Sequence, residues 1–530
     1  MISMLNRVYI EYGILKRRRI ILMYNLVIKN GLVITPDSKE YKDIAVKEGK
    51  IVEIAEVGKL DSSELSEAEI YDAKGKCIIP GLVEPHMHIK APLGGVIDIL
   101  DFDTASKCAA FGGVTTYMDF TSTLPGVPLL QAVQERKEEM KKSTIDHAFH
   151  CKIVNLVTSD LVSTATLAEA KYAQTKTAED KIKAEEANAI VEKSINDRLS
   201  EIPEIVTKEG IPTFKLFMTY RKANVMIDDI YLLKVLKAVK EYGGRCGFHA
   251  ESNAIAEYNE EVFAKEGKLD YKYFPECKPN LCEAEAVSRV LHYAELLNAP
   301  VYFFHISAKE SVELIRQAKK RGVDVIAETC SHYLMLDKSY NDTEDGILYL
   351  MSPPLRAKED QKALWEALND GTLTLVSSDN CTFTRKQKEA PLQNGPRDFR
   401  KPISGVSGIE ERFTLMRWAV EHEKLTEHQF VKLLCENPAK VFGCYPQKGC
   451  LEVGSDADIT IFDPESISRL TREDLHYPEE LEYSVYKEFE AKGKVLTTIR
   501  RGEFLVKDGV YNTKATSGRF LKRKSLSSEI

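Results

Sequence analysis

The segments TFKLFMTY at residues 213–220, RCGFHAES at 245–252 and PVYFFHIS at 300–307 are short and apolar, and longer stretches of helical character separate them. This alternation is typical of a parallel sheet, in which each strand reaches its neighbour through a crossover helix. Such segments recur between residues 80 and 446, and eight parallel strands with helices between them predict a (β/α)8 barrel. The other five are LVEPHMHI at 82–89, TTYMDF at 115–120, FHCKIVNL at 149–156, DVIAETC at 324–330 and LTLVSSD at 373–379.

The two ends of the chain share a different pattern, made of short strands and turns. YNLVIKNGLVIT at residues 24–35 and DIAVKEGKIVEIAEV at 43–57 show it near the start, and DADITIFDP at 456–464 shows it again near the end. We therefore expect the two ends to combine into a smaller composite β-sandwich domain beside the barrel. The expected division is an extension at 1–22 outside the fold, the β domain at 23–79 and 447–513, the barrel at 80–446 and a C-terminal tail at 514–530.

An insertion rich in Ala, Lys and Glu separates the third and fourth predicted barrel strands. It covers residues 168–199, and its charges are spread along the whole segment. This composition favours an exposed helical structure. We assign no chemistry to it.

The composition is that of an ordinary globular protein and excludes several classes. Of 530 residues, 43% are hydrophobic and 29% are charged, and no run reaches the roughly 18 apolar residues that a membrane-spanning helix needs. The formal net charge of −8 argues against a nucleic-acid partner and favours a small molecule. The 11 cysteines are scattered without a Cys-x-x-Cys pair, which indicates reduced thiols and a cytoplasmic location.

Histidines gather at one level of the predicted barrel. His86 and His88 are two residues apart on the first strand, which turns both imidazoles to the same face. His249 ends the fifth strand, His305 the sixth and Asp379 the eighth. Barrel enzymes carry their catalytic groups at the C-terminal ends of the strands, so we expect these side chains to meet at one rim. Imidazole and carboxylate are ligands of divalent metals, and the set predicts a metal site.

Lys215 is unusual because the period-two pattern of its strand turns it toward the barrel interior, on the same face as Phe217. A buried ammonium is costly unless it is paired, and such a lysine tends to lose its proton. Two interpretations remain open from the strand alone. The lysine could pair with an acidic residue of the barrel, or its neutral amine could react with CO2 to give a carbamate that bridges two metal ions.

A series of short motifs runs along the chain in order: PGLVEPHMHI, TFKLFMTY, GFHAES, FFHIS, ETCSHYL, MSPPLR, SSDNCTF, ENPAKVFG and VGSDADITIFDP. Together they resemble the cyclic amidohydrolases, specifically the dihydropyrimidinase and hydantoinase branch. The resemblance extends from about Tyr24 to Lys507, and as a set these motifs are highly specific. It implies the architecture expected above, a metal-dependent hydrolase barrel with a composite β domain.

The resemblance also implies a role for each matching residue. Tyr220 matches the tyrosine that donates a hydrogen bond to the developing oxyanion. Ser352 and Ser404 match positions at which main-chain groups hold the amides of the substrate ring. Lys215 matches the family's bridging lysine, which is modified to N6-carboxylysine, and Asp379 matches the catalytic base. The implied metal ligands are His86, His88, Lys215, His249, His305 and Asp379.

The reaction that the resemblance implies is the metal-dependent hydrolysis of a cyclic amide bond. The substrate is a dihydropyrimidine or hydantoin ring, and the product is an N-carbamoyl amino acid. Two divalent metal ions are implied, with zinc as the expected metal. Family members assemble as homotetramers or homodimers, so we expect the same here, without a nucleic-acid or membrane partner.

Two residues depart from the family pattern. Glu84 stands where the family usually has Asp in an Asp-x-His-x-His turn, and Ser404 stands where dihydropyrimidinases tend to carry Asn. Neither departure removes a ligand, but both leave the substrate open. The alternatives are an allantoinase- or dihydroorotase-like cyclic amidohydrolase, or a non-catalytic scaffold relative. All six ligand positions are filled, which disfavours the scaffold.

Overall fold

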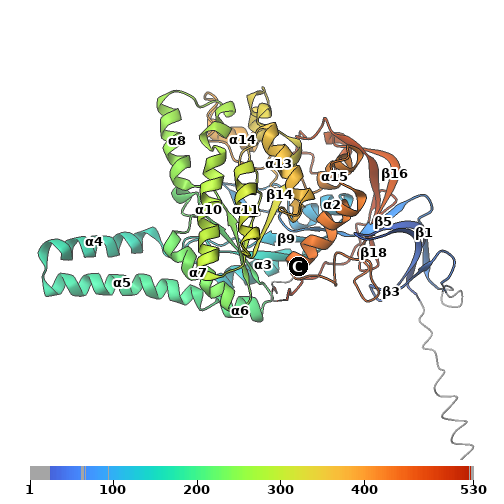
Figure 1. Ribbon diagram of the computed structural model, residues 1–530, viewed down its shortest axis with the longest axis horizontal. Coiled ribbons are helices and arrows are strands. Elements are labelled where there is room, and N and C mark those ends of the chain that lie inside the picture. The colour runs from blue at the N-terminus through green and yellow to red at the C-terminus, as the bar shows by residue number, and fades with distance from the viewer. Residues whose placement is uncertain (1–23, 61–64, 66, 94, 525, 527–530) are drawn as a thin grey trace, which may run out of the picture.

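The computed structural model describes residues 24–60, 65, 67–93, 95–524 and 526. The expected N-terminal extension, residues 1–22, lies outside the described residues. Figure 1 shows a central barrel surrounded by helices, a β-rich part on one side and a long helical hairpin on the other. In the part of the chain that is described, no helix is long and apolar enough to cross a lipid bilayer.

The central sheet has eight strands in the order β15-β14-β13-β12-β11-β10-β9-β6, and each is parallel to its neighbours. The predicted (β/α)8 barrel is therefore confirmed. Nearly every residue of these strands is buried, because the barrel interior covers one face and helices cover the other. The strands are β6 (Leu82–Glu84), β9 (Val114–Phe120), β10 (Asp146–Lys152), β11 (Thr213–Phe217), β12 (Arg245–His249), β13 (Val301–Phe303), β14 (Val325–Cys330) and β15 (Leu375–Ser377).

Helices follow the strands and form the outer layer of the barrel (Figure 1). Local sequence signals start several of them: Asp101 caps α2 by accepting a hydrogen bond from Thr104 N at 2.9 Å. The helices are α2 (Phe102–Phe111), α3 (Leu129–Met140), α6 (Ile202–Thr207), α7 (Asp229–Glu241), α8 (Asn253–Lys265), α9 (Phe274–Cys277), α10 (Asn280–Leu297), α11 (Lys309–Lys320), α12 (Ser331–Met335), α13 (Lys358–Asn369), α14 (Arg385–Glu389), α15 (Glu411–Glu421), α16 (Glu427–Val431) and α17 (Asn437–Val441).

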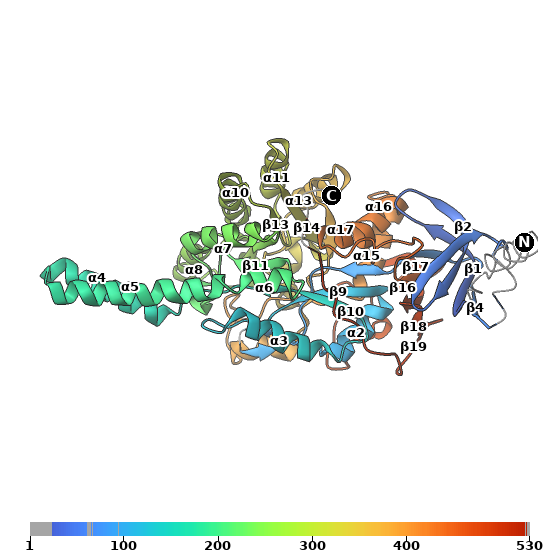
Figure 2. The ribbon, with the colours of Figure 1, turned by 90° about the horizontal axis from the view of Figure 1, so that it is seen from below.

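The insertion after β10 is a hairpin of two helices, α4 (Ser159–Thr175) and α5 (Ala178–Leu199), that projects away from the barrel (Figures 1 and 2). The turn between them is built by Lys176, in the left-handed conformation, and by Thr177, which caps α5 through Asp180 N. The predicted exposed helical insertion is confirmed, and it begins earlier than residue 168.

The β-rich part combines strands from both ends of the chain in one sheet (Figure 2). Its order is β19-β18-β17-β16-β5-β1-β2-β3, with β4 beside β1, and β5 joins the N-terminal strands to the C-terminal ones. The composite β domain is confirmed, while the residue boundaries of the domains stay a prediction. The strands are β1 (Leu26–Ile34), β2 (Lys39–Lys47), β3 (Lys50–Glu56), β4 (Glu69–Asp72), β5 (Cys77–Pro80), β16 (Ile459–Arg469), β17 (Glu490–Arg500), β18 (Glu503–Lys507) and β19 (Val510–Tyr511).

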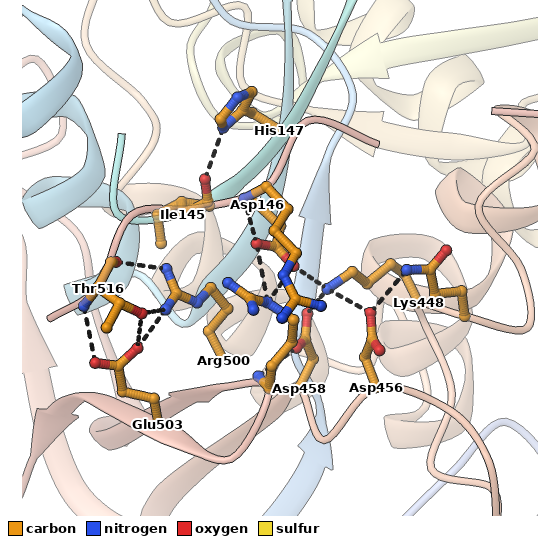
Figure 3. A network of polar contacts seen from close by, with 12 residues as sticks. Ile145, Asp146, His147, Lys448, Asp456, Asp458, Arg500, Glu503 and Thr516 are labelled. Carbon is orange, nitrogen blue, oxygen red and sulfur yellow. Dashed lines mark hydrogen bonds and ion pairs between the residues drawn. The ribbon is translucent and has the colours of Figure 1, made fainter. Parts of the chain in front are cut away.

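A buried lysine, Lys448, connects the barrel to the β-rich part (Figure 3). Its Nζ lies 2.6 Å from Asp146 at the start of β10, 2.7 Å from Asp458 just before β16 and 3.1 Å from Asp456. Burial alone would lower the pKa of Lys448, but these carboxylates raise it, so the side chain stays charged. A charge in the interior is tolerated only when it is paired in this way, and the pairing fixes the two parts together.

The C-terminal tail runs across the N-terminal mouth of the barrel. Leu521 N donates to the main-chain oxygen of His147, near the start of β10, at 2.8 Å. The Leu521 side chain belongs to the buried cluster inside the barrel that also contains Met118 and Phe304. Arg523 is buried as well and donates to a main-chain oxygen of β10 at 2.5 Å. The tail therefore completes the floor of the barrel.

We expect Leu521→Ala to lower the free energy of unfolding by about 2–5 kcal/mol, because it leaves a cavity at the barrel floor. Urea unfolding of the purified protein measures the change. Leu167→Ala is the matched control, since Leu167 on α4 is 70% exposed and its loss should matter little. A cost at Leu521 no larger than that of the control would show that the tail does not support the barrel.

Candidate metal centre

Two histidines that follow the first barrel strand meet an aspartate that follows the last. His86 Nε2 lies 2.9 Å and His88 Nε2 3.2 Å from Asp379 Oδ1. One ligand atom from each of the three lies within 4.8 Å of the others, which is the spacing of a shared metal site. The expectation that both histidines lie on the strand is wrong, because β6 ends at Glu84. Pro85 has no N–H for the sheet, and so it ends the strand.

Glu328 on β14 orients the deeper of these histidines. Its Oε1 accepts a hydrogen bond from His86 Nδ1 at 2.5 Å, and its Oε2 accepts one from the Tyr302 hydroxyl at 2.5 Å. His86 Nε2 is buried, faces Asp379 and has no well-aligned hydrogen bond in the described residues. A carboxylate behind one ring nitrogen and a free second nitrogen is the usual arrangement of a metal-bound histidine.

His249, the last residue of β12, and His305, which follows the neighbouring strand β13, form a second pair. Their ring centroids are 4.5 Å apart, and the His305 ring lies 5.5 Å from that of His86. Burial lowers the pKa of both imidazoles, which are therefore neutral, as metal binding requires. Glu251 accepts a hydrogen bond from His249 Nε2 at 2.7 Å, so that Nδ1 is left for a ligand role.

Lys215 points into the barrel between aromatic rings, on the face that the period-two pattern predicts. Its Nζ lies 3.7 Å from the ring centroid of Phe304 and 5.3 Å from that of Phe120. Burial lowers the pKa of Lys215 to about 7, so part of the amine is neutral at physiological pH. The carboxylates of Asp379 and Glu328 act against this lowering of the pKa, but in the described part of the chain neither forms an ion pair with Lys215. Of the two interpretations of this lysine, the geometry favours the carbamate.

Three residues of the site have main chain in the left-handed region. The φ angles are 68° at Tyr220, 41° at His305 and 45° at Asp379, and each residue follows shortly after the end of its strand. Residues other than glycine rarely adopt this conformation, and it is concentrated where a side chain must point in a fixed direction. The strain therefore marks the same rim as the histidines.

The expected substrate contacts Tyr220 and Ser352 lie beside the second histidine pair. The Tyr220 ring centroid is 5.2 Å from that of His249, and burial raises the pKa of its phenol, which stays protonated. Lys278 Nζ lies 2.7 Å from Ser352 Oγ and 5.3 Å from the centroid of the Tyr220 ring. Lys278 therefore lies close to both expected substrate contacts, Tyr220 and Ser352.

The segment of Ser404 is held against the segment of Ser352. Gly405 N donates to the main-chain oxygen of Leu350 at 2.9 Å. Lys388, on α14, is fully buried, and its Nζ donates to the same oxygen at 3.4 Å and to that of the residue before Ser404 at 3.2 Å. The loop that carries α14 therefore ties the two expected ring-binding segments together.

Sequence reasoning missed the charged residues behind the ligands. Glu251 and Glu328 lie within the motifs GFHAES and ETCSHYL, so their proximity to ligands was a usable signal, but no spacing in the sequence pairs Glu251 with Lys278. His332, in the motif ETCSHYL, was not assigned to the site either. It is buried, and one of its ring nitrogens lies within 4.8 Å of an Asp379 oxygen.

The donor set fits a divalent transition metal. Burial would raise the pKa of Asp379, but His86 and His88 hold it well below its usual range, so the carboxylate is ionised. Burial lowers the pKa of His88, His249 and His305, which are neutral. Burial alone would also lower the pKa of His86, but Asp379 and Glu328 raise it to about 9, so a bound metal must displace a proton from this ring. Imidazoles with one ionised carboxylate suit zinc, manganese, cobalt or nickel, whereas calcium and magnesium prefer oxygen ligands alone. The free His86 Nε2 is an atom that a metal would satisfy.

Comparisons with known proteins agree with this geometry. The model of the amidohydrolase family matches residues 77–505. A D-hydantoinase of Ralstonia pickettii is 36% identical over 503 residues, which are 94% of this chain and 99% of the relative, and a D-hydantoinase of Rhizobium radiobacter is 34% identical over the same shares. The crystal structure of a dihydropyrimidinase from Brevibacillus agri superposes with a TM-score of 0.82 at 33% identity, over 95% of this chain and 99% of that one.

Lys388 should make the stability depend on pH. Burial lowers the pKa of Lys388 to about 7 from the usual 10.5, so folding releases a proton between these values and the free energy of unfolding rises with pH across that window. Below the window both states carry the charge, and the folded state bears the full cost of burying it. We expect the difference in free energy of unfolding between wild type and Lys388→Met to rise from pH 7 to 10. A difference that stays flat in chemical denaturation would contradict a buried lysine with a lowered pKa.

Proposed function

Because this chain belongs to the amidohydrolase family, we propose that it hydrolyses the ring amide of a dihydropyrimidine or hydantoin to an N-carbamoyl amino acid. The observation that carries the proposal is the meeting of His86, His88 and Asp379 at the C-terminal rim of the barrel. The relatives named D-hydantoinase and dihydropyrimidinase support the choice of ring.

The proposed cofactor is a pair of divalent metal ions, with zinc as the expected metal. His86, His88 and Asp379 would hold one ion, His249 and His305 the other, and Lys215, as N6-carboxylysine, would lie between them. When bound, two such ions lower the pKa of an attacking water and polarise the scissile carbonyl. The buried, neutral imidazoles and the lowered pKa of Lys215 support this assignment.

Asp379 is the proposed proton carrier. It accepts the proton of the attacking water and delivers it to the ring nitrogen that leaves. Its carboxylate is ionised and is held by His86 and His88, so it presents an acceptor in a fixed direction. The main chain of Asp379 is in the left-handed region, which residues other than glycine rarely adopt. This unusual conformation supports a role in which the direction of the side chain matters.

Tyr220 is the proposed donor to the oxyanion that forms as the water attacks. Its phenol stays protonated because burial raises its pKa, and its ring packs beside His249. A donor held in place before the reaction stabilises developing charge without reorganising. Main-chain groups near Ser352 and Ser404 would hold the ring amides in register with it.

The charges near the site favour an uncharged ring. Lys278 is paired with Glu251 at 2.9 Å, and Arg356 lies 3.9 Å from Glu283, so these buried cations have acidic partners. Dihydroorotate carries a carboxylate, which would require an unpaired cation. We therefore expect dihydrouracil or a 5-substituted hydantoin to be a better substrate than dihydroorotate.

We also propose a reducing, cytoplasmic location and a homotetrameric or homodimeric assembly. All 11 cysteines are free and buried, which supports the location. Size-exclusion chromatography with light scattering measures the assembly directly.

A substrate panel tests the proposed function. The metal-loaded enzyme is assayed on dihydrouracil, substituted hydantoins, allantoin and dihydroorotate, and kcat/KM is compared. We expect ring opening to be fastest for dihydrouracil or a hydantoin, because Lys278 and Arg356, the buried cations considered near the site, already have acidic partners. A preference for allantoin or dihydroorotate would assign the chain to another branch, and no ring opening at all would support a non-catalytic relative.

Lys215→Ala should lose most of its metal and nearly all its activity, because the proposed bridging oxygens are gone. Metal quantification per chain and kcat are measured together, and partial rescue by a short carboxylate such as acetate is expected. Lys319→Met is the control, since Lys319 lies at the end of α11 and donates to the main-chain oxygen of Gly371, which follows α13. Full metal occupancy with normal turnover in Lys215→Ala would refute the bridging role.

A further inference from the structure

One buried ion pair lies between a proposed metal ligand and a proposed ring contact. Glu251 follows β12 by two residues, and Lys278 precedes α10. Glu251 is fully buried and Lys278 is 6% exposed. The proposed chemistry assigns neither residue a role, yet taking two charges out of water is expensive. The position of the pair therefore requires an explanation.

The contacts of the pair converge on a single carboxylate oxygen. Glu251 Oε2 accepts from His249 Nε2 at 2.7 Å, from Lys278 Nζ at 2.9 Å and from Ser352 Oγ at 3.3 Å. Lys278 Nζ also donates to Ser352 Oγ at 2.7 Å. One ligand histidine and one ring-contact serine thus share the same two charged partners.

The main chain of Lys278 is itself fixed. Arg356, at the end of the motif MSPPLR, donates through Nη1 to the Lys278 main-chain oxygen, and its Nε donates to Ser307 Oγ at 3.1 Å. Ser352 lies in the same motif, so the lysine is held by this segment at both its main chain and its side chain. The loop before α10 is therefore bonded to the segment of Ser352 at two points.

We propose that Glu251 and Lys278 are positioning residues that couple the His249 ligand to the ring-holding segment of Ser352. This inference rests on the proposed function, because it needs a metal at His249 and a ring at Ser352. Glu251 fixes the ring of His249 so that Nδ1 faces the site. Lys278 fixes Glu251 and Ser352 relative to each other. The distance between the reacting carbonyl and the ring amides is then set by a rigid, charge-balanced link and not by a mobile loop.

The link between Lys278 and Ser352 is tested by a double-mutant cycle. Lys278→Met, Ser352→Ala and the double variant are assayed on the ring that the wild type opens best. Each variant is assayed with its metal sites saturated, so that the separate contact of Lys278 with Glu251 does not change metal occupancy. We expect Lys278→Met to raise KM about tenfold or more, and to change KM less than about twofold in the Ser352→Ala background, because the contact between Lys278 and Ser352 is already gone. Effects of Lys278→Met that are equal in both backgrounds would overturn the coupling.

The link to His249 is tested by metal content, which does not depend on turnover. Lys278→Met leaves Glu251 without its counter-charge, and we expect it to bind at least about tenfold less metal at limiting zinc. The double variant Lys278→Met/Glu251→Gln restores charge balance and should recover part of that loss. An unchanged metal content in Lys278→Met would overturn this half of the proposal.

Two further measurements separate positioning from loss of fold. Lys319→Met removes a partly buried lysine far from the pair and should keep KM and metal content at wild-type values. Melting temperatures are recorded for every variant, and Lys278→Gln replaces Lys278→Met if the latter does not fold. If the wild type opens no ring, the proposed function fails, while the metal-binding comparison still decides whether the pair holds His249.

Discussion

The site depends on how the barrel closes between its first and last strands. Glu84, the last residue of β6, is fully buried, and its carboxylate accepts hydrogen bonds from Ser378 N at 3.2 Å and His86 N at 2.9 Å. Arg412 Nε lies 3.1 Å from the same carboxylate and balances its charge. We call these contacts of Glu84 with Ser378, His86 and Arg412 the Glu84 clasp. Next to the clasp, His88 N donates to Asn380 O at 2.7 Å. The closure sets the two histidines opposite Asp379.

The clasp also explains what a glutamate does at a position where the family usually has aspartate. Its carboxylate spans from the first strand to the main chain of the last, and an isolated β-bridge pairs Met87 with Asn380 just beyond it. A side chain and a single bridge therefore close this part of the barrel together. The candidate ligands His86 and His88 therefore lie after the end of β6, on a segment that contacts the last strand.

Buried acidic side chains at this rim have hydrogen-bonding or charged partners. Glu328 holds His86, Glu251 holds His249 and is neutralised by Lys278, and Glu84 is neutralised by Arg412. Each acid fixes an imidazole or a main-chain group. Glu251 and Glu84 each have a basic partner, and Glu328 accepts hydrogen bonds from His86 and the Tyr302 hydroxyl, because a buried carboxylate without such partners would be costly. At the opposite mouth, an apolar side chain of the tail, Leu521, fills the floor of the barrel.

The sequence by itself determined the barrel, the composite β domain and the identity of the candidate ligands. It did so because strand and helix alternate with a readable period, and because His and Asp recur at the ends of those strands, where the fold must bring them together. Only the tertiary structure decided the partners. Glu251 pairs with Lys278, and Glu84 binds the main chain of the last strand, although these residues are distant from each other in the sequence. His332 is buried beside Asp379 for the same reason. No local sequence pattern encodes such contacts. The docking of the tail on the barrel floor is of the same kind, since hydrophobic burial acts between whatever surfaces the fold brings into contact.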